Sequence, residues 1–236
     1  MNCPLCSVLE SIHLYCYHIT TNLLPLVMDL WYYCITTTAK DKEGLIVSQP
    51  LMKSPEEGLR YTYDDYYSWD DGQRWELIDG AAYLMSPAPS WNHQGVLVEL
   101  IKKISLFLEG RPCKVYPAPF DVRLNADAGD NTVVQPDIVV ICDLSRLDER
   151  GGYRGAPEMV VEILSPSSAR RDKLVKFNQY QKAGVREYWI VDPDTKTVSA
   201  HILENGKYII SAFGDEDIVP VHVLEGCEID LSEVFE

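Results

Sequence analysis

The chain has 236 residues, of which 46% are apolar and 24% are charged, and this is the composition of an ordinary soluble protein with one substantial core. Its 36 acidic and 21 basic side chains give a net charge of -15. A protein that coats nucleic acid non-specifically needs a broadly basic surface, which this net charge argues against. The charge leaves room for a local basic patch or for an acidic site that gathers metal ions.

The cysteine pattern and the hydropathy both predict a cytoplasmic protein with no membrane partner. Cys113, Cys142 and Cys227 are scattered along the chain and are expected to be reduced thiols. The longest apolar run, residues 23–35, is interrupted by a proline and an aspartate and is too short to span a bilayer. The N-terminus also lacks the basic start and the cleavage site of a signal peptide.

Residues 1–51 differ in composition from the rest and are interpreted as an atypical N-terminal extension, either disordered or the product of an over-extended start before Met52. A small zinc site is the functional alternative. Its ligands would come from Cys3, Cys6, His13, Cys16 and His18. Zinc modules usually space their ligand pairs about 12 or more residues apart, so this closely spaced set favours the first interpretation. Residues 52–236 are expected to form the functional domain.

From residue 52 onward the pattern alternates between strands and helices. Residues 61–68 suit a short helix with Thr62 as its N-cap. Residues 74–85 carry the signal of a β-hairpin that turns at Asp79-Gly80. Residues 93–109 have the apolar spacing of a helix with one buried face.

The second half adds most of the strands, predicted at residues 114–124, 132–142, 158–164, 187–192, 197–203, 207–212 and 219–224. A helix is expected over residues 169–183, after the capping sequence Ser165-Pro-Ser-Ser and before Gly184. This order of elements predicts an α/β (α+β) fold in which helices flank a central mixed β-sheet.

Two acidic residues accompany apolar strands. Asp137 stands at the entry of a hydrophobic strand, directly after Pro136, and Glu162 lies inside the next strand. Consecutive strands are usually neighbours, so the two carboxylates are expected to converge. Two such anions repel each other unless a proton or a cation separates them, and Mg²⁺ accepts one or two carboxylates. In the alternative interpretation both acids have only a structural role: Asp137 caps a strand and Glu162 pairs with a buried basic residue.

The following helix offers that basic residue. At 100° per residue one row of the helix is formed by Asp172, Lys176 and Tyr180, beside an apolar stripe of Leu174 and Phe177. Lys176 can therefore reach a strand carboxylate, with Lys173 as a rival, or it can form a surface pair with Asp172. Arg170 and Arg171 suit either a phosphate contact or a solvated surface.

Together these motifs resemble the Uma family of restriction-endonuclease-like proteins in the PD-(D/E)XK nuclease superfamily. The resemblance covers about residues 58–225 and rests on Glu76-Leu-Ile-Asp-Gly80, Pro87-Ala-Pro-Ser with His93, Pro136-Asp137, Val161-Glu-Ile-Leu-Ser-Pro-Ser167, Asp172-x₃-Lys176-x₃-Tyr180 and Gly184-Val-Arg-Glu-Tyr-Trp-Ile-Val-Asp-Pro193. It does not extend to residues 1–51.

The resemblance implies a restriction-endonuclease-like fold with Asp137 and Glu162 as ligands of Mg²⁺, or of Mn²⁺. The superfamily's usual lysine lies two residues after the glutamate, where this chain has Leu164. Lys176 matches the family's own lysine position and is the candidate for a migrated catalytic lysine. Glu76 or His93 completes the site in this interpretation, Glu76 directly and His93 through a water.

The sequence thus predicts a metal-dependent endonuclease that hydrolyses DNA, in which Lys176 orients the attacking water or stabilises charge on the phosphate. One alternative is a catalytically inactive nuclease fold used as a binding or regulatory module, which the acidity and Leu164 favour. Another is a hydrolase of a different phosphodiester, because a carboxylate site alone does not identify the substrate. A homodimer is a further expectation, since two-fold symmetry would present two sites to opposite strands of a duplex.

Overall fold

The computed structural model describes residues 55–85, 89–165 and 171–235. The chain divides into two units, residues 1–51 and 52–236, and the description below concerns the second unit alone. The three cysteines and two histidines considered for a zinc site lie outside the described residues, and so do Arg170 and the side chain of Arg171.

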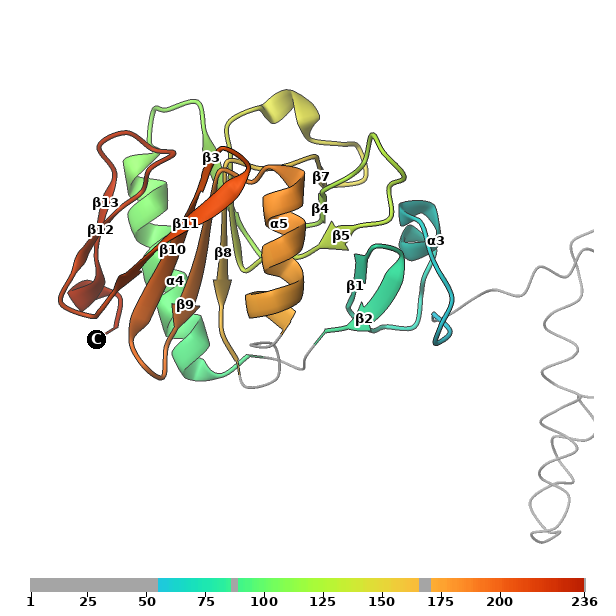
Figure 1. Ribbon diagram of the computed structural model, residues 1–236, viewed down its shortest axis with the longest axis horizontal. Helices are drawn as coiled ribbons and strands as arrows, with labels where there is room; N and C mark the ends of the chain where they lie inside the picture. Colours follow the sequence, from blue (N-terminus) through green and yellow to red (C-terminus); the bar gives the residue numbers. More distant parts are fainter. Residues whose placement is uncertain (1–54, 86–88, 166–170, 236) are drawn as a thin grey trace, which may run out of the picture. The chain divides into compact units, whose positions relative to one another are not determined.

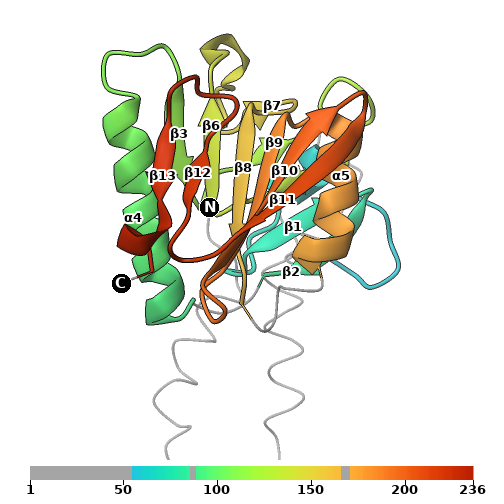
Figure 2. The same ribbon diagram turned by 60° about the vertical axis from the view of Figure 1, so that its left-hand side comes forward.

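The domain has a central sheet with elements on both of its faces (Figures 1 and 2). One face packs against α4 (Trp91–Phe107) and the hairpin of β12 (Ile218–Pro220) and β13 (Glu228–Asp230). The other face packs against α5 (Phe177–Ala183) and a second, smaller sheet. The expected fold class, a mixed sheet flanked by helices, is confirmed.

The central sheet has six strands in the order β11-β10-β9-β8-β6-β3. These strands are β3 (Lys114–Pro117), β6 (Ile138–Ile141), β8 (Met159–Ile163), β9 (Glu187–Asp192), β10 (Thr197–Glu204) and β11 (Lys207–Phe213). Only the β8–β9 pair is parallel, and the helical segment between those two strands makes the crossover that a parallel pair requires. The inner strands β6 and β8 are covered on both faces and are apolar except for Glu162 in β8, whereas β9 and β10 also contain polar residues.

The smaller sheet has five strands in the order β2-β1-β5-β4-β7. They are β1 (Trp75–Ile78), β2 (Ala81–Leu84), β4 (Val122–Arg123), β5 (Val133–Val134) and β7 (Tyr153–Arg154). The expected hairpin is confirmed as β1–β2, and its turn residues Asp79 and Gly80 both have positive φ angles, of 47° and 80°. Asn/Asp-Gly pairs favour this turn because both of its central residues need a left-handed backbone.

Two of the helices begin directly after an N-capping residue. Ser90 caps α4 by accepting a hydrogen bond from the backbone N of His93 at 3.2 Å, so α4 starts two residues before its predicted start. Thr62 caps α3 (Tyr63–Tyr67), and its backbone N donates to Asp65 at 2.8 Å. The predicted helix over residues 169–183 consists, within the described part, of the π-helical segment η2 (Arg171–Lys176) followed by α5. Short 3₁₀ turns, η1 (Leu144–Arg146) and η3 (Leu231–Glu233), complete the helical segments.

Three strand predictions differ from the structure in their extent. The strand expected over residues 114–124 is divided into β3 and β4, where Pro117 and Pro119 remove backbone donors. The strand expected over residues 132–142 is interrupted at Gln135-Pro136 for the same reason. The last predicted strand shortens to β12, and β13 was not predicted at all.

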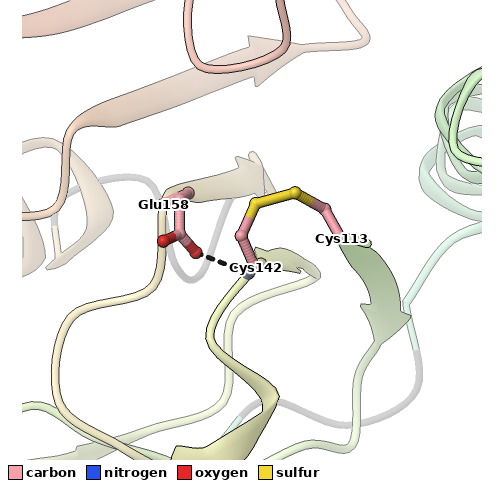
Figure 3. Close-up of a disulfide and its surroundings, with 3 residues drawn as sticks. All are labelled: Cys113, Cys142 and Glu158. Carbon is pink, nitrogen blue, oxygen red and sulfur yellow. Dashed lines mark hydrogen bonds between the residues drawn. A yellow bond between two sulfur atoms is a disulfide. The ribbon is translucent and has the colours of Figure 1, made fainter. Parts of the chain in front are cut away.

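The expectation of three reduced thiols is wrong for two of them. Cys113 and Cys142 form a disulfide, with their Cα atoms 4.0 Å apart, at the ends of the antiparallel strands β3 and β6 (Figure 3). The backbone N of Cys142 also donates to Glu158 at 2.7 Å. The pairing of Lys114 with Ile141 places the two cysteines opposite each other one residue further along. Cys227 is a free, buried thiol whose pKa burial raises to about 11.

None of the helices in the described ranges is both long and apolar enough to cross a membrane. The cytoplasmic location stays a prediction.

Candidate active site

Asp137 and Glu162 face each other across paired strands. β6 and β8 run antiparallel with Ile138 opposite Val161, so the next position of the same register sets Asp137 against Glu162. Directly opposed residues of an antiparallel pair point to the same face, with Cβ atoms about 5 Å apart. The backbone N of Ile163 donates to Asp137 Oδ2 at 2.7 Å, which fixes this carboxylate against β8. The sequence-based expectation that these two residues lie on neighbouring strands agrees with this geometry.

Each of the two carboxylates has its contacts on a single oxygen. In Asp137 the hydrogen bond from Ile163 and the 3.3 Å contact with His93 Nε2 both fall on Oδ2. In Glu162 the bonds from Lys176 and Tyr180 both fall on Oε1. Asp137 Oδ1 and Glu162 Oε2 have no hydrogen-bond partner among the described residues. Within the described part of the chain, each acid therefore keeps one oxygen without a hydrogen bond.

Lys176 is the lysine that reaches Glu162. Its ammonium lies 2.8 Å from Glu162 Oε1, 2.7 Å from Glu76 Oε1 and 3.6 Å from Asp172 Oδ1. Only 2% of Lys176 is exposed to solvent, whereas Lys173 points into solvent. An ammonium has three N–H donors, and three carboxylates surround this one. The geometry thus separates the two lysines that the sequence left as rivals.

The polar row of the helical segment is its buried face. Asp172, Lys176 and Tyr180 are all buried, whereas Leu174 is 57% exposed. The prediction that Leu174 and Phe177 form the buried stripe of this helical segment is therefore wrong for Leu174. The alternative of a solvent-exposed Asp172–Lys176 pair is also wrong, because both residues are buried. The charges can be buried because they meet partners on the sheet: Tyr180 donates to Glu162 at 2.6 Å, and Tyr188 donates to the backbone O of Asp172 at 3.0 Å.

Burial and mutual repulsion set the electrostatics of this cluster. Burial raises the pKa of Glu162 well above its ordinary value, against the opposing charge of Lys176 and with the help of the nearby acids. Burial lowers the pKa of Lys176, but Glu162, Glu76 and Asp172 outweigh it, so the lysine pKa lies above its ordinary value and the ammonium stays charged. Three acids around one lysine leave an excess of negative charge, which a proton or a cation would offset.

Glu76 brings the smaller sheet into the site. It lies on β1, is fully buried, and its Oε1 accepts from both Lys176 and the backbone N of Gln135, the latter at 3.0 Å. Gln135 is two residues before Asp137, so Glu76 also holds the turn that leads into β6. Because Oε1 of Glu76 already binds Lys176 and Gln135, we assign Glu76 the role of positioning Lys176 and this turn.

His93 reaches the site from the other face of the central sheet. It lies in the first turn of α4, is 6% exposed, and places Nε2 at 3.3 Å from Asp137 Oδ2. Burial lowers the pKa of His93, but the hydrogen bond and charge of Asp137 outweigh this effect, and the net shift is upward. Its Nδ1 is buried and has no hydrogen-bond partner within the described ranges. His93 therefore steadies the oxygen of Asp137 that also binds β8.

Comparisons with known proteins identify the family of this chain. Residues 63–232 match the Uma2 family, described as "Putative restriction endonuclease". The chain belongs to the Uma2 family. It is 26% identical over 158 residues to the uncharacterized protein slr1290 of Synechocystis sp., covering 65% of this chain and 80% of that protein. A crystal structure of a "putative nuclease belonging to DUF820" from Anabaena variabilis shares the fold, with a TM-score of 0.60 and 21% identity over 74% of this chain and 97% of that one.

The resemblance to the Uma family is thereby confirmed, and the description of that family supports a nuclease. Among its described residues, the Uma2 domain has no group of three or more His, Cys, Asp or Glu side chains arranged to hold a metal ion. A cation at this site would thus rest on Asp137 and Glu162 and complete its shell with water, as Mg²⁺ commonly does.

The sequence did not predict that two further residues, Asp172 and Tyr180, belong to the candidate site. Asp172 was weighed only as a surface partner of Lys176, and Tyr180 only as a member of its row. A spacing of i, i+4, i+8 that contains an acid, a lysine and a tyrosine was the available signal, because such a row can face inward when it meets a buried acid on the neighbouring sheet.

Proposed function

We propose that this Uma2 protein is a Mg²⁺- or Mn²⁺-dependent endonuclease that hydrolyses phosphodiester bonds of DNA. The observation that carries the proposal is the pair of opposed carboxylates, Asp137 and Glu162, each with one oxygen that accepts no hydrogen bond from the described residues. The family description supports hydrolysis of a nucleic acid. With a net charge of -15, DNA contact would be local and not spread over the whole surface.

The donor set suits a hard divalent cation. Carboxylate oxygens are the ligands that Mg²⁺ and Mn²⁺ prefer, and the excess of negative charge around Lys176 favours a cation over a neutral ligand. A divalent cation held by Asp137 and Glu162 would supply Lewis acidity at the phosphate that is cleaved.

The chain's own residues hold the two acids in place. Lys176 and Tyr180 hold Oε1 of Glu162 by two hydrogen bonds, which fixes the position of the carboxylate. His93 and the backbone N of Ile163 fix Oδ2 of Asp137 in the same way. Lys176 keeps its proton and its donors point at acids. Its role in the proposed reaction is therefore to position Glu162 and to contribute a fixed positive charge, not to transfer a proton.

A cleavage assay tests the proposal. The full chain is incubated with plasmid DNA and Mg²⁺ or Mn²⁺, beside the variants Asp137→Asn and Glu162→Gln. Matched controls replace the exposed acids in the variants Asp70→Asn and Glu225→Gln, which remove the same charge away from the site. We expect metal-dependent cleavage by the native chain and by both controls, and its loss in both site variants. Equal cleavage by the native and site variants would contradict the proposal.

A catalytically inactive nuclease fold is the second candidate. The enclosure of Lys176 by three acids, together with Leu164 at the superfamily's lysine position, is the observation that favours it. A rise in unfolding temperature with Mg²⁺ or Mn²⁺ measures whether the native chain binds the metal at all. Metal binding without cleavage of DNA, RNA or a small phosphodiester would support the inactive fold. Cleavage of the small phosphodiester alone would indicate a different hydrolase.

A further inference from the structure

Trp91 is the most exposed large apolar side chain in the described part of the chain, with 86% of its surface open to solvent. The other described tryptophans are built into the fold. Trp189 is fully buried and donates to Glu187 at 2.8 Å. Trp69 and Trp75 are half-buried, with their ring centroids 5.9 Å apart. Within the described residues, Trp91 has neither a ring contact nor a hydrogen bond from its Nε1.

The fold does not need the indole of Trp91. A tryptophan that packs in a protein buries about 150–250 Å² of surface, and a ring left in solvent forgoes that stabilisation. Trp91 is the first residue of α4, but Ser90 makes the cap of this helix, and the helix propensity of tryptophan is only moderate. The ring is therefore available for a contact outside this chain.

Trp91 stands beside the candidate active site. It precedes by two residues His93, whose Nε2 lies 3.3 Å from Asp137 Oδ2. Between them, the side chain of Asn92 donates to the backbone O of Pro193 at 3.5 Å, directly after β9. The start of α4 thus lies at the end of the central sheet where the parallel strands β8 and β9 both end (Figure 1). This is the end of the sheet that holds the two opposed carboxylates.

We propose that the indole of Trp91 stacks on a nucleobase of DNA bound at the candidate site, and that the preferred substrate has unpaired bases near the cleaved bond. The inference rests on the proposed nuclease function and names its class of substrate. Every base has a flat π face, so an exposed aromatic ring binds bases irrespective of their sequence. In an intact duplex the neighbouring base pairs cover these faces, and exposing one costs unstacking energy. A single strand, a gap or an open end presents such a face without that cost.

The charge of the chain favours a contact of this kind. Proteins that bind nucleic acid non-specifically obtain most of their affinity from basic side chains on phosphates, and this chain has a net charge of -15. Stacking is an uncharged contact that this acidity does not oppose. The first turn of α4 also contains no acidic residue, so no carboxylate of that turn repels the strand beside the indole.

The exposed apolar residues further along α4 define the competing explanation, a protein partner on this helix. Val98 and Leu106 are 58% and 59% exposed. A protein partner would use them together with Trp91. A nucleobase contact uses Trp91 alone, because Leu106 lies about 22 Å further along the helix at 1.5 Å per residue. Leu106→Ala is therefore the matched control, an exposed apolar side chain of the same helix removed far from the site.

Oligonucleotide binding to the full chain, followed by fluorescence anisotropy, tests the proposal. The probes are a labelled single strand of about 16 nucleotides and the blunt duplex of the same sequence, measured with a chelator and again with Mg²⁺. We expect the native chain to bind the single strand more tightly than the duplex. Trp91→Ala should weaken binding of the single strand roughly 5- to 150-fold, while Trp91→Phe and Leu106→Ala keep most of it. Unfolding temperature should be unchanged in all three variants.

Salt dependence separates stacking from a disturbance of phosphate contacts. For single strands, the logarithm of the binding constant falls with the logarithm of salt concentration by about 0.7 per phosphate contact. Trp91→Ala should lower the binding constant by the same factor at every salt concentration and leave this slope unchanged. A changed slope would overturn the stacking contact.

Other results would also overturn the proposal. They are equal affinity of the native chain and Trp91→Ala, an equal loss in Leu106→Ala, and a native chain that binds neither probe, which would assign Trp91 to a protein interface. An equal loss on the duplex would overturn the preference for unpaired bases. The two proposals fail separately: binding through Trp91 without any cleavage contradicts the nuclease alone, and cleavage that is insensitive to Trp91→Ala contradicts the stacking alone.

Discussion

Replacing the buried lysine tests the electrostatic reasoning most directly. Lys176→Met keeps an unbranched side chain that is one atom shorter and removes a charge that lies within 3.6 Å of three carboxylates. One of those acids must then take up a proton in the folded state. Protonating a group with an ordinary pKa of about 4.3 at pH 7.5 costs about 4 kcal/mol, within the range of about 3–5 kcal/mol for breaking a buried ion pair.

The sign of the pH dependence follows from the same proton. Above pH 4.3, approximately, the folded variant binds a proton that the unfolded chain lacks, so its stability falls as pH rises, by about 1.4 kcal/mol per unit relative to the native protein. The deficit of Lys176→Met should therefore shrink from about 4 kcal/mol at pH 7.5 to about 1.5 kcal/mol at pH 5.5. A loss of about 4 kcal/mol corresponds to a decrease in unfolding temperature of roughly 8–16 °C.

The assay is denaturant unfolding of the full chain at several pH values, followed by circular dichroism and with a chelator present so that no divalent ion replaces the lost charge. The control Lys173→Met removes an exposed lysine of the same helical segment and should change stability by less than about 0.5 kcal/mol. The reasoning is refuted if the two variants lose equal stability, or if the loss in Lys176→Met is independent of pH.

Three further predictions concern other parts of the domain. Tyr180→Phe removes the donor to Glu162 and keeps the ring, so we expect a loss of about 1.5–3 kcal/mol in denaturant unfolding, and no loss would mean that the 2.6 Å bond is not made. Reduction, or replacement of Cys113 and Cys142 by serine, should lower stability by about 3–4 kcal/mol because the bond closes a loop with a sequence separation of 29, and mass spectrometry of the alkylated protein reports its presence. Burial lowers the pKa of His201, so below about pH 6.5 the histidine is protonated in the unfolded chain before it is protonated in the folded one. The native protein should therefore lose stability as the pH falls through this range. His201→Phe should flatten this part of the plot of stability against pH.

The sequence predicted the positions of the strands that carry the two acids, because each strand is short, apolar and bounded by turn residues. It also predicted that Asp137 and Glu162 lie on neighbouring strands, since consecutive strands usually pair. It did not predict their exact opposition, because register depends on the pairing of β6 with β8, and no local pattern states that pairing.

The inward face of the helix could not be read from hydrophobicity. Leu174 is exposed and Lys176 is buried because the partners of the lysine, Glu76 and Glu162, come from two different sheets. A helical projection considers one helix at a time and assigns its burial to apolar residues. The disulfide was missed for a related reason, since Cys113 and Cys142 become neighbours only through the pairing of β3 with β6.

The contacts of Lys176 have a consequence for how the protein folds. Glu76 comes from an early hairpin, Glu162 from a central strand and Lys176 from a helix that follows it, so the cluster closes only when all three have docked. Contacts between such distant parts of a chain form late, because long loops must be ordered first. A partly folded chain would therefore lack the arrangement that holds Glu162, and any activity of this site would report the completed fold and be absent from its folding intermediates.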